Sequence, residues 1–271
     1  MKNHLKPIAA FTLIELLVVL AVIALLGATL LPALAISGSK VQKITCINNL
    51  KQLGFAYRSW EAANNGHYPQ AVAAHSGGAQ DYCTHGGNNS STGTLPAIAY
   101  NPGMVYIVMS NYLAGPKILF CPADTFHYGA ATNISYGDLL SIFTPANGAN
   151  ASQLNALTKV SYFVGADATE ADPQSILAGD CNIGNTGTSG NAPSTARFGA
   201  TVSGTLSAPE ITSVAFGSAI AWAWTANDMH LKTGNLLIAD GSVQSTTIIG
   251  LHTFMQNTTN TVLGPCWNFL P

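Results

Sequence analysis

The sequence predicts an α+β protein in which one long N-terminal helix carries a globular head built around antiparallel strands. Three features predict this fold. Residues 16–36 contain no charged side chain, residues 46–60 repeat apolar positions at helical spacing, and residues 64–271 alternate short apolar runs with segments rich in Gly, Asn, Ser and Thr. The helix is therefore expected to have an apolar half and an amphipathic half, followed by the head.

The N-terminus has the parts of an export segment in an unusual order. Residues 1–10 form a short leader with Lys2 and Lys6 that ends in two small residues, Ala9 and Ala10. A secretory signal normally places its small-residue cleavage site after its apolar run. Here the small residues come first, so cleavage at this point leaves the hydrophobic helix on the mature protein.

The apolar segment, residues 11–36, is long enough for a membrane-spanning helix, which needs about 20 residues. Glu15 is its only charged residue. A carboxylate inside a membrane is costly unless it is paired, so Glu15 is either a functional residue or an interfacial one at the level of the lipid headgroups. Pro32 removes one helical hydrogen bond, and it either kinks the helix or is tolerated there, as prolines are in membrane helices.

Residues 37–63 predict the amphipathic half of the same helix, with one face packed on the head. The apolar positions recur at alternating steps of four and three residues: Cys46, Leu50, Leu53, Tyr57 and Trp60. The polar residues Lys51, Gln52 and Arg58 fall outside this stripe. Residues 64–66, Asn-Asn-Gly, are expected to end the helix.

The head, residues 64–271, is predicted to contain short strands and long loops. Its clearest hairpin signal is Asp240-Gly241, which separates two strand-like runs. Glycine adopts positive φ without strain and aspartate tolerates it better than most residues, so the pair favours a tight turn. We expect residues 236–239 to pair with residues 243–246.

Composition and motifs exclude several classes of function. The formal net charge of −2 provides no basic surface of the kind that binds nucleic acid. The chain has no nucleophile elbow, no zinc-protease helix motif, no P-loop and no dinucleotide-binding glycine motif, so we expect no enzymatic activity.

The five cysteines are widely spaced and include no C-x-x-C pair: Cys46, Cys83, Cys121, Cys181 and Cys266. Zinc sites usually show such close pairs, whereas an exported chain favours disulfides. The spacing alone does not determine the pairing. Cys46 lies on the apolar stripe and Cys121 in a loop-like Cys-Pro segment, so we predict that Cys46 is buried against the head with Cys121 as its preferred partner. The alternative is that Cys46 is an unpaired core residue.

Residues 10–19, AFTLIELLVV, resemble the prepilin motif of type IV pilins and type II secretion pseudopilins. In that family a peptidase cuts before the Phe on the cytoplasmic face and methylates the new amino terminus. The resemblance implies cleavage between Ala10 and Phe11 and methylation of Phe11, although Ala10 stands where the family usually has Gly. It also implies that Glu15 pairs with the free amino terminus of a neighbouring subunit. Pro32 fits a proline near which the family's helix bends or melts during filament packing.

The head carries a second resemblance, to pilin-like proteins of the planctomycete and verrucomicrobial lineages. His230, followed after nine residues by Asp240-Gly241, matches the H-X9-DG signature at the C-terminus of that family. Three further segments fit the same family: residues 46–53, 120–124 and 177–182.

His230, Asp180 and Asp240 suggest a metal site, but chain geometry argues against one. An extended strand over residues 235–239 separates its ends by about 17 Å, so His230 and Asp240 meet only if residues 231–234 double back. We expect no metal and no cofactor, with His230 as a buried hydrogen-bonding residue and Asp240 as a turn residue. Some pseudopilins bind calcium through loop carboxylates, which makes Asp180 and Asp240 the candidates for an alternative calcium site.

The resemblance implies a structural subunit of a type IV pilus-like or type II secretion pseudopilus filament that assembles through its N-terminal helix. The expected partners are further copies of the chain, a prepilin peptidase, the inner-membrane assembly machinery and membrane lipid. The expected location is the bacterial inner membrane with a periplasmic head, and afterwards a surface or periplasm-spanning filament. Two alternatives are a minor or adhesive pilin and a membrane-tethered periplasmic binding or hydrolytic domain on a pilin stem.

Overall fold

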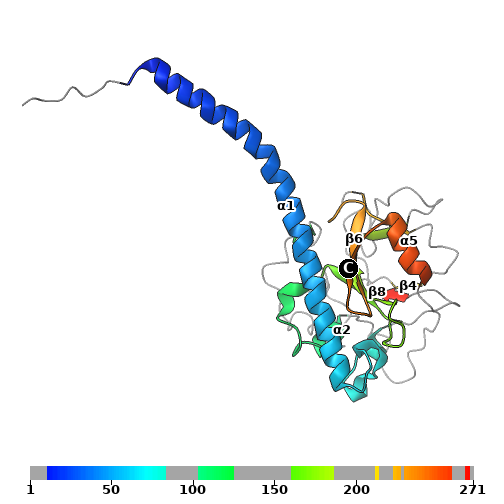
Figure 1. The fold of residues 1–271 in the computed structure, drawn as a ribbon. Coiled ribbons are helices and arrows are strands. Elements are labelled where there is room, and N and C mark those ends of the chain that lie inside the picture. Colours follow the sequence, from blue (N-terminus) through cyan, green and yellow to red (C-terminus); the bar gives the residue numbers. More distant parts are fainter. Residues whose placement is uncertain are drawn as a thin grey trace, which may run out of the picture. The chain divides into compact units, whose positions relative to one another are not determined.

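The computed structural model describes residues 11–83, 103–124, 160–185, 211–213, 222–226, 229–257 and 266–268. For residues 30–37, 185, 211–213, 222, 256–257 and 266–268 it describes the backbone without the side chains. It confirms the α+β fold class, with a long N-terminal helix followed by an antiparallel sheet (Figure 1). The chain divides into two compact units, Met1–Val41 and Gln42–Pro271. Helix α1 (Leu13–Ala63), 51 residues long, begins in the first unit and ends in the second.

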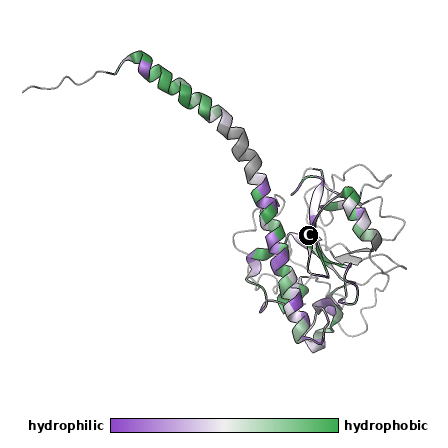
Figure 2. Cartoon of the chain, in the orientation of Figure 1, coloured by the Kyte–Doolittle hydropathy of each residue, from purple (hydrophilic) through white to green (hydrophobic). Residues whose placement is uncertain are grey.

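The first unit contains the apolar beginning of α1, which Figure 2 shows as a nearly continuous hydrophobic run. Its large side chains are exposed, from Phe11 and Leu13 to Leu25 and Leu26. Within the described residues, no helix combines the length and the hydropathy that a membrane crossing requires.

In the second unit, α1 packs one face on the head, as its spacing predicts. The five residues of the stripe are almost completely buried: Cys46, Leu50, Leu53, Tyr57 and Trp60. Lys51, Gln52 and Arg58 are exposed. Four-three spacing returns side chains to the same side of an α-helix, so this face enters the core while its neighbours remain in water.

The described strands form two antiparallel sheets. The larger sheet has six strands in the order β4-β8-β1-β2-β6-β7: β4 (Ile211–Ser213), β8 (Cys266–Asn268), β1 (Tyr162–Gly165), β2 (Ile176–Asp180), β6 (Thr233–Ile238) and β7 (Val243–Thr247). The smaller sheet pairs β3 (Ile183–Asn185) with β5 (Trp222–Trp224). The remaining described helices are short: η1 (Pro69–Ala71), η2 (Ala74–Ser76), η3 (Gln80–Tyr82), α2 (Met104–Val108), η4 (Pro116–Leu119) and α5 (Ile248–Asn257).

Helix α1 and strand β6 lie side by side and are joined near both ends of the strand. Lys43 Nζ donates to Thr233 Oγ1 at 3.3 Å, and Arg58 Nη2 donates to the carbonyl of Ala239 at 2.7 Å. The helix between Lys43 and Arg58 is about 22 Å long, and the strand from Thr233 to Ala239 is about 20 Å long. These matched lengths allow both contacts to form on a straight helix.

A glycine lets the helix come close to β6 between these two contacts. A Cβ added at Gly54 would lie 2.7 Å from Leu237 Cδ1, which is closer than real Cβ contacts come. Tyr68 adds a second donor to the Ala239 carbonyl, with its hydroxyl 3.0 Å away. The hairpin is thereby fixed against the helix and the segment that follows it.

The hairpin predicted from Asp240-Gly241 is confirmed, with a different turn geometry. β6 pairs with β7 in the register Leu237↔Val243 to Thr233↔Thr247. Gly241 is in the left-handed region, with φ of 87°, and its N–H donates to the Ile238 carbonyl at 2.9 Å. Asp240 has no positive φ; its carboxylate accepts from Ser242 N at 2.7 Å. Ala239 and Asp240 are therefore the central turn residues, and Gly241 closes a three-residue loop.

Candidate functional site

The N-terminus of α1 is capped by reciprocal hydrogen bonds between Thr12 and Glu15. Thr12 N and Thr12 Oγ1 each donate to Glu15 Oε2 at 2.8 Å, and Glu15 N donates to Thr12 Oγ1 at 3.3 Å. This is a capping box, in which two residues three apart satisfy backbone donors that have no partner in the helix. The sequence interpretation missed it, although Thr-x-x-Glu before an apolar run is the usual signal.

The other residues assigned to processing and assembly have separate surroundings. Ala10 lies outside the described residues. Phe11 is 71% exposed. The backbone of α1 is helical through position 32, while the side chain of Pro32 lies outside the described part.

A second cluster lies in the head, where Cys46 of α1 meets Cys121, just beyond η4. The two residues are 75 positions apart in sequence, and the structure places a disulfide between them with Cα atoms 5.0 Å apart. Both are completely buried. Cys121 N donates to the hydroxyl of Ser161 at 3.0 Å, which fixes the loop against the residue before β1. Helix and loop are thus joined covalently in the core.

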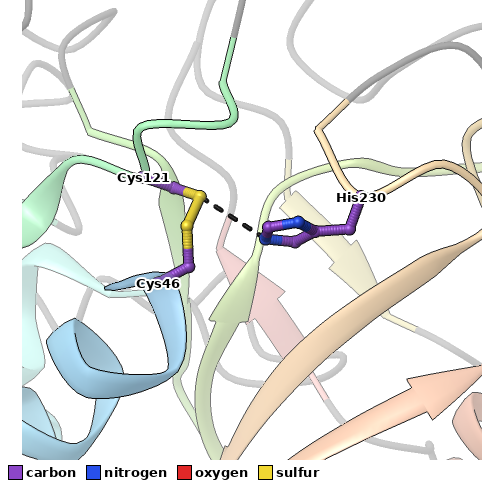
Figure 3. Close-up of side chains that lie close together, drawn as sticks. All are labelled: Cys46, Cys121 and His230. Carbon is purple, nitrogen blue, oxygen red and sulfur yellow. Dashed lines mark hydrogen bonds between the residues drawn. A yellow bond between two sulfur atoms is a disulfide. The ribbon is translucent and has the colours of Figure 1, made fainter. Parts of the chain in front are cut away.

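The imidazole of His230 points its Nε2 at this disulfide (Figure 3). Nε2 lies 3.5 Å from Cys121 Sγ and 3.5 Å from Asp180 Oδ2, and the side chain is only 3% exposed. A disulfide sulfur has no proton to give, so the ring N–H is the donor to it. The expected buried, hydrogen-bonded histidine therefore contacts a sulfur and a carboxylate.

Asp180, the last residue of β2, is completely buried beside His230. Its Oδ2 accepts from the backbone and side-chain nitrogens of Asn235 at 2.7 and 2.8 Å. Burial raises the pKa of Asp180 to about 7, against the lowering effect of the Asn235 hydrogen bonds. Burial, with a smaller contribution from Lys43, lowers the pKa of His230 to about 4. The ring is therefore uncharged at neutral pH, and its contact with Asp180 is not an ion pair.

The structure does not bring Asp240 to this cluster. Asp240 is exposed in the β6–β7 turn, and its N–H donates to the Pro173 carbonyl at 3.3 Å. His230 precedes β6 and Asp240 follows it, so the length of the strand separates them. Asp180 lies beside Asn235 near the first of these ends. The two calcium candidates are thus at opposite ends of β6 and share no site.

The cluster was not predicted as a unit. The predicted pairing of Cys46 with Cys121 is confirmed, but the contact of His230 with this pair was not predicted, since Cys121 and His230 are 109 positions apart. A search for closely spaced ligands does not connect them. A weaker signal was present. The four segments that carry this second family resemblance each supply one member, namely Cys46, Cys121, Asp180 and His230.

Residues 5–31 match the family model described as "Prokaryotic N-terminal methylation motif". The matched segment includes Ala10, Phe11 and Glu15. It supports a type IV pilin-like protein and, in general terms, processing by a prepilin peptidase and assembly into filaments. Comparisons with curated proteins and with solved structures find no match.

Proposed function

We propose that the chain is a structural subunit of a type IV pilus-like or type II secretion pseudopilus filament. The observation that carries this proposal is the methylation motif over residues 5–31. Such a motif is typical of structural subunits rather than of enzymes. Before assembly the apolar part of α1 is held in the bacterial inner membrane with the head in the periplasm, and after cleavage before Phe11 it packs against other copies.

The exposed apolar side chains of the first unit support this assignment. From Phe11 to Thr29 the polar side chains are Thr12, Glu15 and Thr29, and most of the large apolar ones are more than half exposed. Removing apolar surface from water is favourable by about 25 cal/mol of free energy per Å². A continuous apolar surface of this kind marks contact with lipid or with another protein.

The head is suited to transmit a load from the helix. Within the second unit, α1 is fixed to β6 through Lys43 and Arg58 and to the loop after η4 through the Cys46–Cys121 disulfide. Force on the helix is therefore carried by two hydrogen bonds, one to a hydroxyl and one to a backbone carbonyl, and by a covalent bond, as well as by side-chain packing. This is a mechanical role that requires no catalytic group.

The carboxylate of Glu15 has two roles to separate, one in capping α1 and one in assembly. In the chain alone, Oε2 accepts from Thr12 in the capping box. In a filament, the family resemblance implies that the carboxylate pairs with the amino terminus of a neighbouring subunit. The first role needs only a hydrogen-bond acceptor, and glutamine can supply it. The second needs the negative charge.

Comparing Glu15→Gln with Glu15→Ala separates these roles. Both changes leave an apolar helix, so membrane insertion should be unchanged, and both should strongly reduce the yield of sheared fibres. Thr12→Ala, which weakens the capping box but keeps the charge, is the matched control and should assemble. Wild-type fibre yield from Glu15→Gln would contradict the pairing role and leave only capping. If the wild-type chain stays entirely in the membrane fraction in fibre-producing cells, a tethered periplasmic domain is the better assignment.

A further inference from the structure

We propose that the head, when its disulfide is reduced, binds one tetrahedral transition-metal ion of the Zn²⁺ type through Cys46, Cys121 and His230. Within the described residues these three side chains bring one ligand atom each to within 4.8 Å of one another. Asp180, whose Oδ2 lies 3.5 Å from His230 Nε2, is the proposed fourth ligand. Metal and disulfide would then be alternative ways to join α1 to the loop after η4.

Two distances around His230 fit a tetrahedral site. With zinc–sulfur bonds of about 2.3 Å and zinc–nitrogen or zinc–oxygen bonds of about 2.0 Å, neighbouring ligand atoms lie about 3.3 to 3.8 Å apart. His230 Nε2 is 3.5 Å from Cys121 Sγ and 3.5 Å from Asp180 Oδ2. Figure 3 shows the ring approaching the sulfurs along the direction of its Nε2. Cys46 Sγ and the histidine nitrogen lie within 4.8 Å of each other, so after reduction the two sulfurs must separate and the ligands must close around the ion.

The fourth position has a candidate that is buried and incompletely satisfied. Asp180 is completely buried. Its Oδ2, 3.5 Å from His230 Nε2, already accepts from Asn235, whereas its Oδ1 has no hydrogen-bond partner among the described residues. A carboxylate oxygen left without a partner in the core loses its hydration without compensation. A cation bound beside it supplies that compensation. Two sulfurs and one imidazole favour a thiolate-binding metal and disfavour Ca²⁺, which takes oxygen ligands.

The loop that presents His230 is held in an uncommon conformation. Met229, Leu231 and Lys232 have φ of 44°, 48° and 59°, in the left-handed region that non-glycine residues rarely adopt. Lys232 N donates to the Thr225 carbonyl at 2.8 Å, and Thr233 Oγ1 donates to the His230 carbonyl at 2.7 Å. Strain of this kind is concentrated at sites where a side chain must be aimed. Here it aims the imidazole at the sulfurs.

The disulfide and the metal-bound state exclude each other, because a sulfur bonded in the disulfide is not available as a thiolate ligand. A dithiol reductant transfers two electrons to the Cys46–Cys121 bond and becomes a disulfide itself, leaving two thiols in the head. Metal binding then releases the two thiol protons. Both sulfurs are completely buried, so a reductant reaches them before the head closes or when it opens.

The test uses the full-length chain in detergent, reduced with a dithiol that is then removed under anaerobic conditions. Titration with Co²⁺ should give one bound ion per chain, with a thiolate-to-metal charge-transfer band and the ligand-field bands of four-coordinate cobalt. Zn²⁺ should displace it. The oxidised chain should show neither the charge-transfer band nor the ligand-field bands. Absence of a charge-transfer band in the reduced chain would overturn the proposal.

Variants assign the ligands. Cys121→Ser and His230→Ala should weaken Co²⁺ binding about tenfold or more, whereas Cys83→Ser and His67→Ala, which change a cysteine and a histidine outside the cluster, should not. Asp180→Asn should alter the ligand-field bands. Wild-type binding by Cys121→Ser would contradict the site.

An alkylation experiment on the wild-type chain tests the site without substitutions, in case the variants fail to fold. Zn²⁺ should protect Cys46 and Cys121 of the reduced chain from alkylation, mapped by mass spectrometry. Protection confined to Cys83, Cys181 or Cys266 would place the metal elsewhere and overturn the proposal.

Discussion

The Cys46–Cys121 disulfide closes a loop of 75 residues inside the head. Cross-linking positions so far apart restricts the unfolded chain, and a native disulfide typically contributes about 2–4 kcal/mol to the free energy of unfolding. We predict that the double change Cys46→Ala and Cys121→Ala lowers this free energy by about 2–4 kcal/mol. Urea unfolding followed by tryptophan fluorescence, in the presence of a metal chelator, measures it. Cys83→Ala controls for loss of a buried sulfur, and an equal effect of both changes would contradict the prediction.

Gly241 is the residue of the hairpin turn whose backbone depends most on its lack of a side chain. Its φ is 87°. For a residue with a Cβ atom, the left-handed region is higher in conformational energy by roughly 1–2 kcal/mol. We predict that Gly241→Ala destabilises the head by about 1 kcal/mol. Gly241→Asn should cost less, because asparagine tolerates this conformation better. Equal thermal stability of Gly241→Ala and the wild-type chain would show that the turn relaxes freely.

At the residue scale, the sequence predicted the burial of Cys46 and its pairing with Cys121, but not the contact of His230 with that disulfide. Spacing along one helix was enough to place Cys46 in the core, because helical periodicity is local. The contact of His230 with Asp180 depends on the register of β2 against β6, and the contact with Cys121 depends on how the loop after η4 meets α1. Neither relation is local in sequence, so no short motif could specify it.

At the element scale, the buried face of α1 is the main link between helix and sheet. Leu53 is completely buried, whereas Phe55, two positions later on the same helix, is 72% exposed. We predict that Leu53→Ala lowers the free energy of unfolding by about 2–5 kcal/mol, through lost burial and a cavity. Phe55→Ala, a larger truncation, should change it by less than about 0.5 kcal/mol. Chemical denaturation of the two variants checks this, and a comparable loss in both would mean that the helix does not pack as described.

Long, periodic or turn-marked elements were predictable individually, whereas the short internal strands were expected only as a class. Helix α1 follows from its spacing, and the β6–β7 hairpin from its Asp-Gly signal. In β1 and β2 every residue is buried, so the alternation that normally identifies a strand is missing. Strand β8 pairs with β1 across about a hundred residues, and such a pairing leaves no local trace in the sequence.

At the scale of the whole molecule, the two units carry different functional features. The first carries the methylation motif and the exposed apolar side chains, and the second carries the sheet, the disulfide and the buried histidine. On this basis we propose that the first unit directs processing and assembly, while the second supplies a stable head. Changes in the buried cluster should therefore alter the stability of the head without altering cleavage of the leader.

The central claim is that the chain is processed as a prepilin and enters a filament. Intact-mass and N-terminal peptide analysis of the chain recovered from sheared fibres of native cells tests it most directly. We predict a mature chain that begins at N-methylated Phe11 and retains the apolar part of α1. A chain that keeps Met1 and occurs only in the membrane fraction, or one cleaved after the apolar segment and released without it, would contradict the claim.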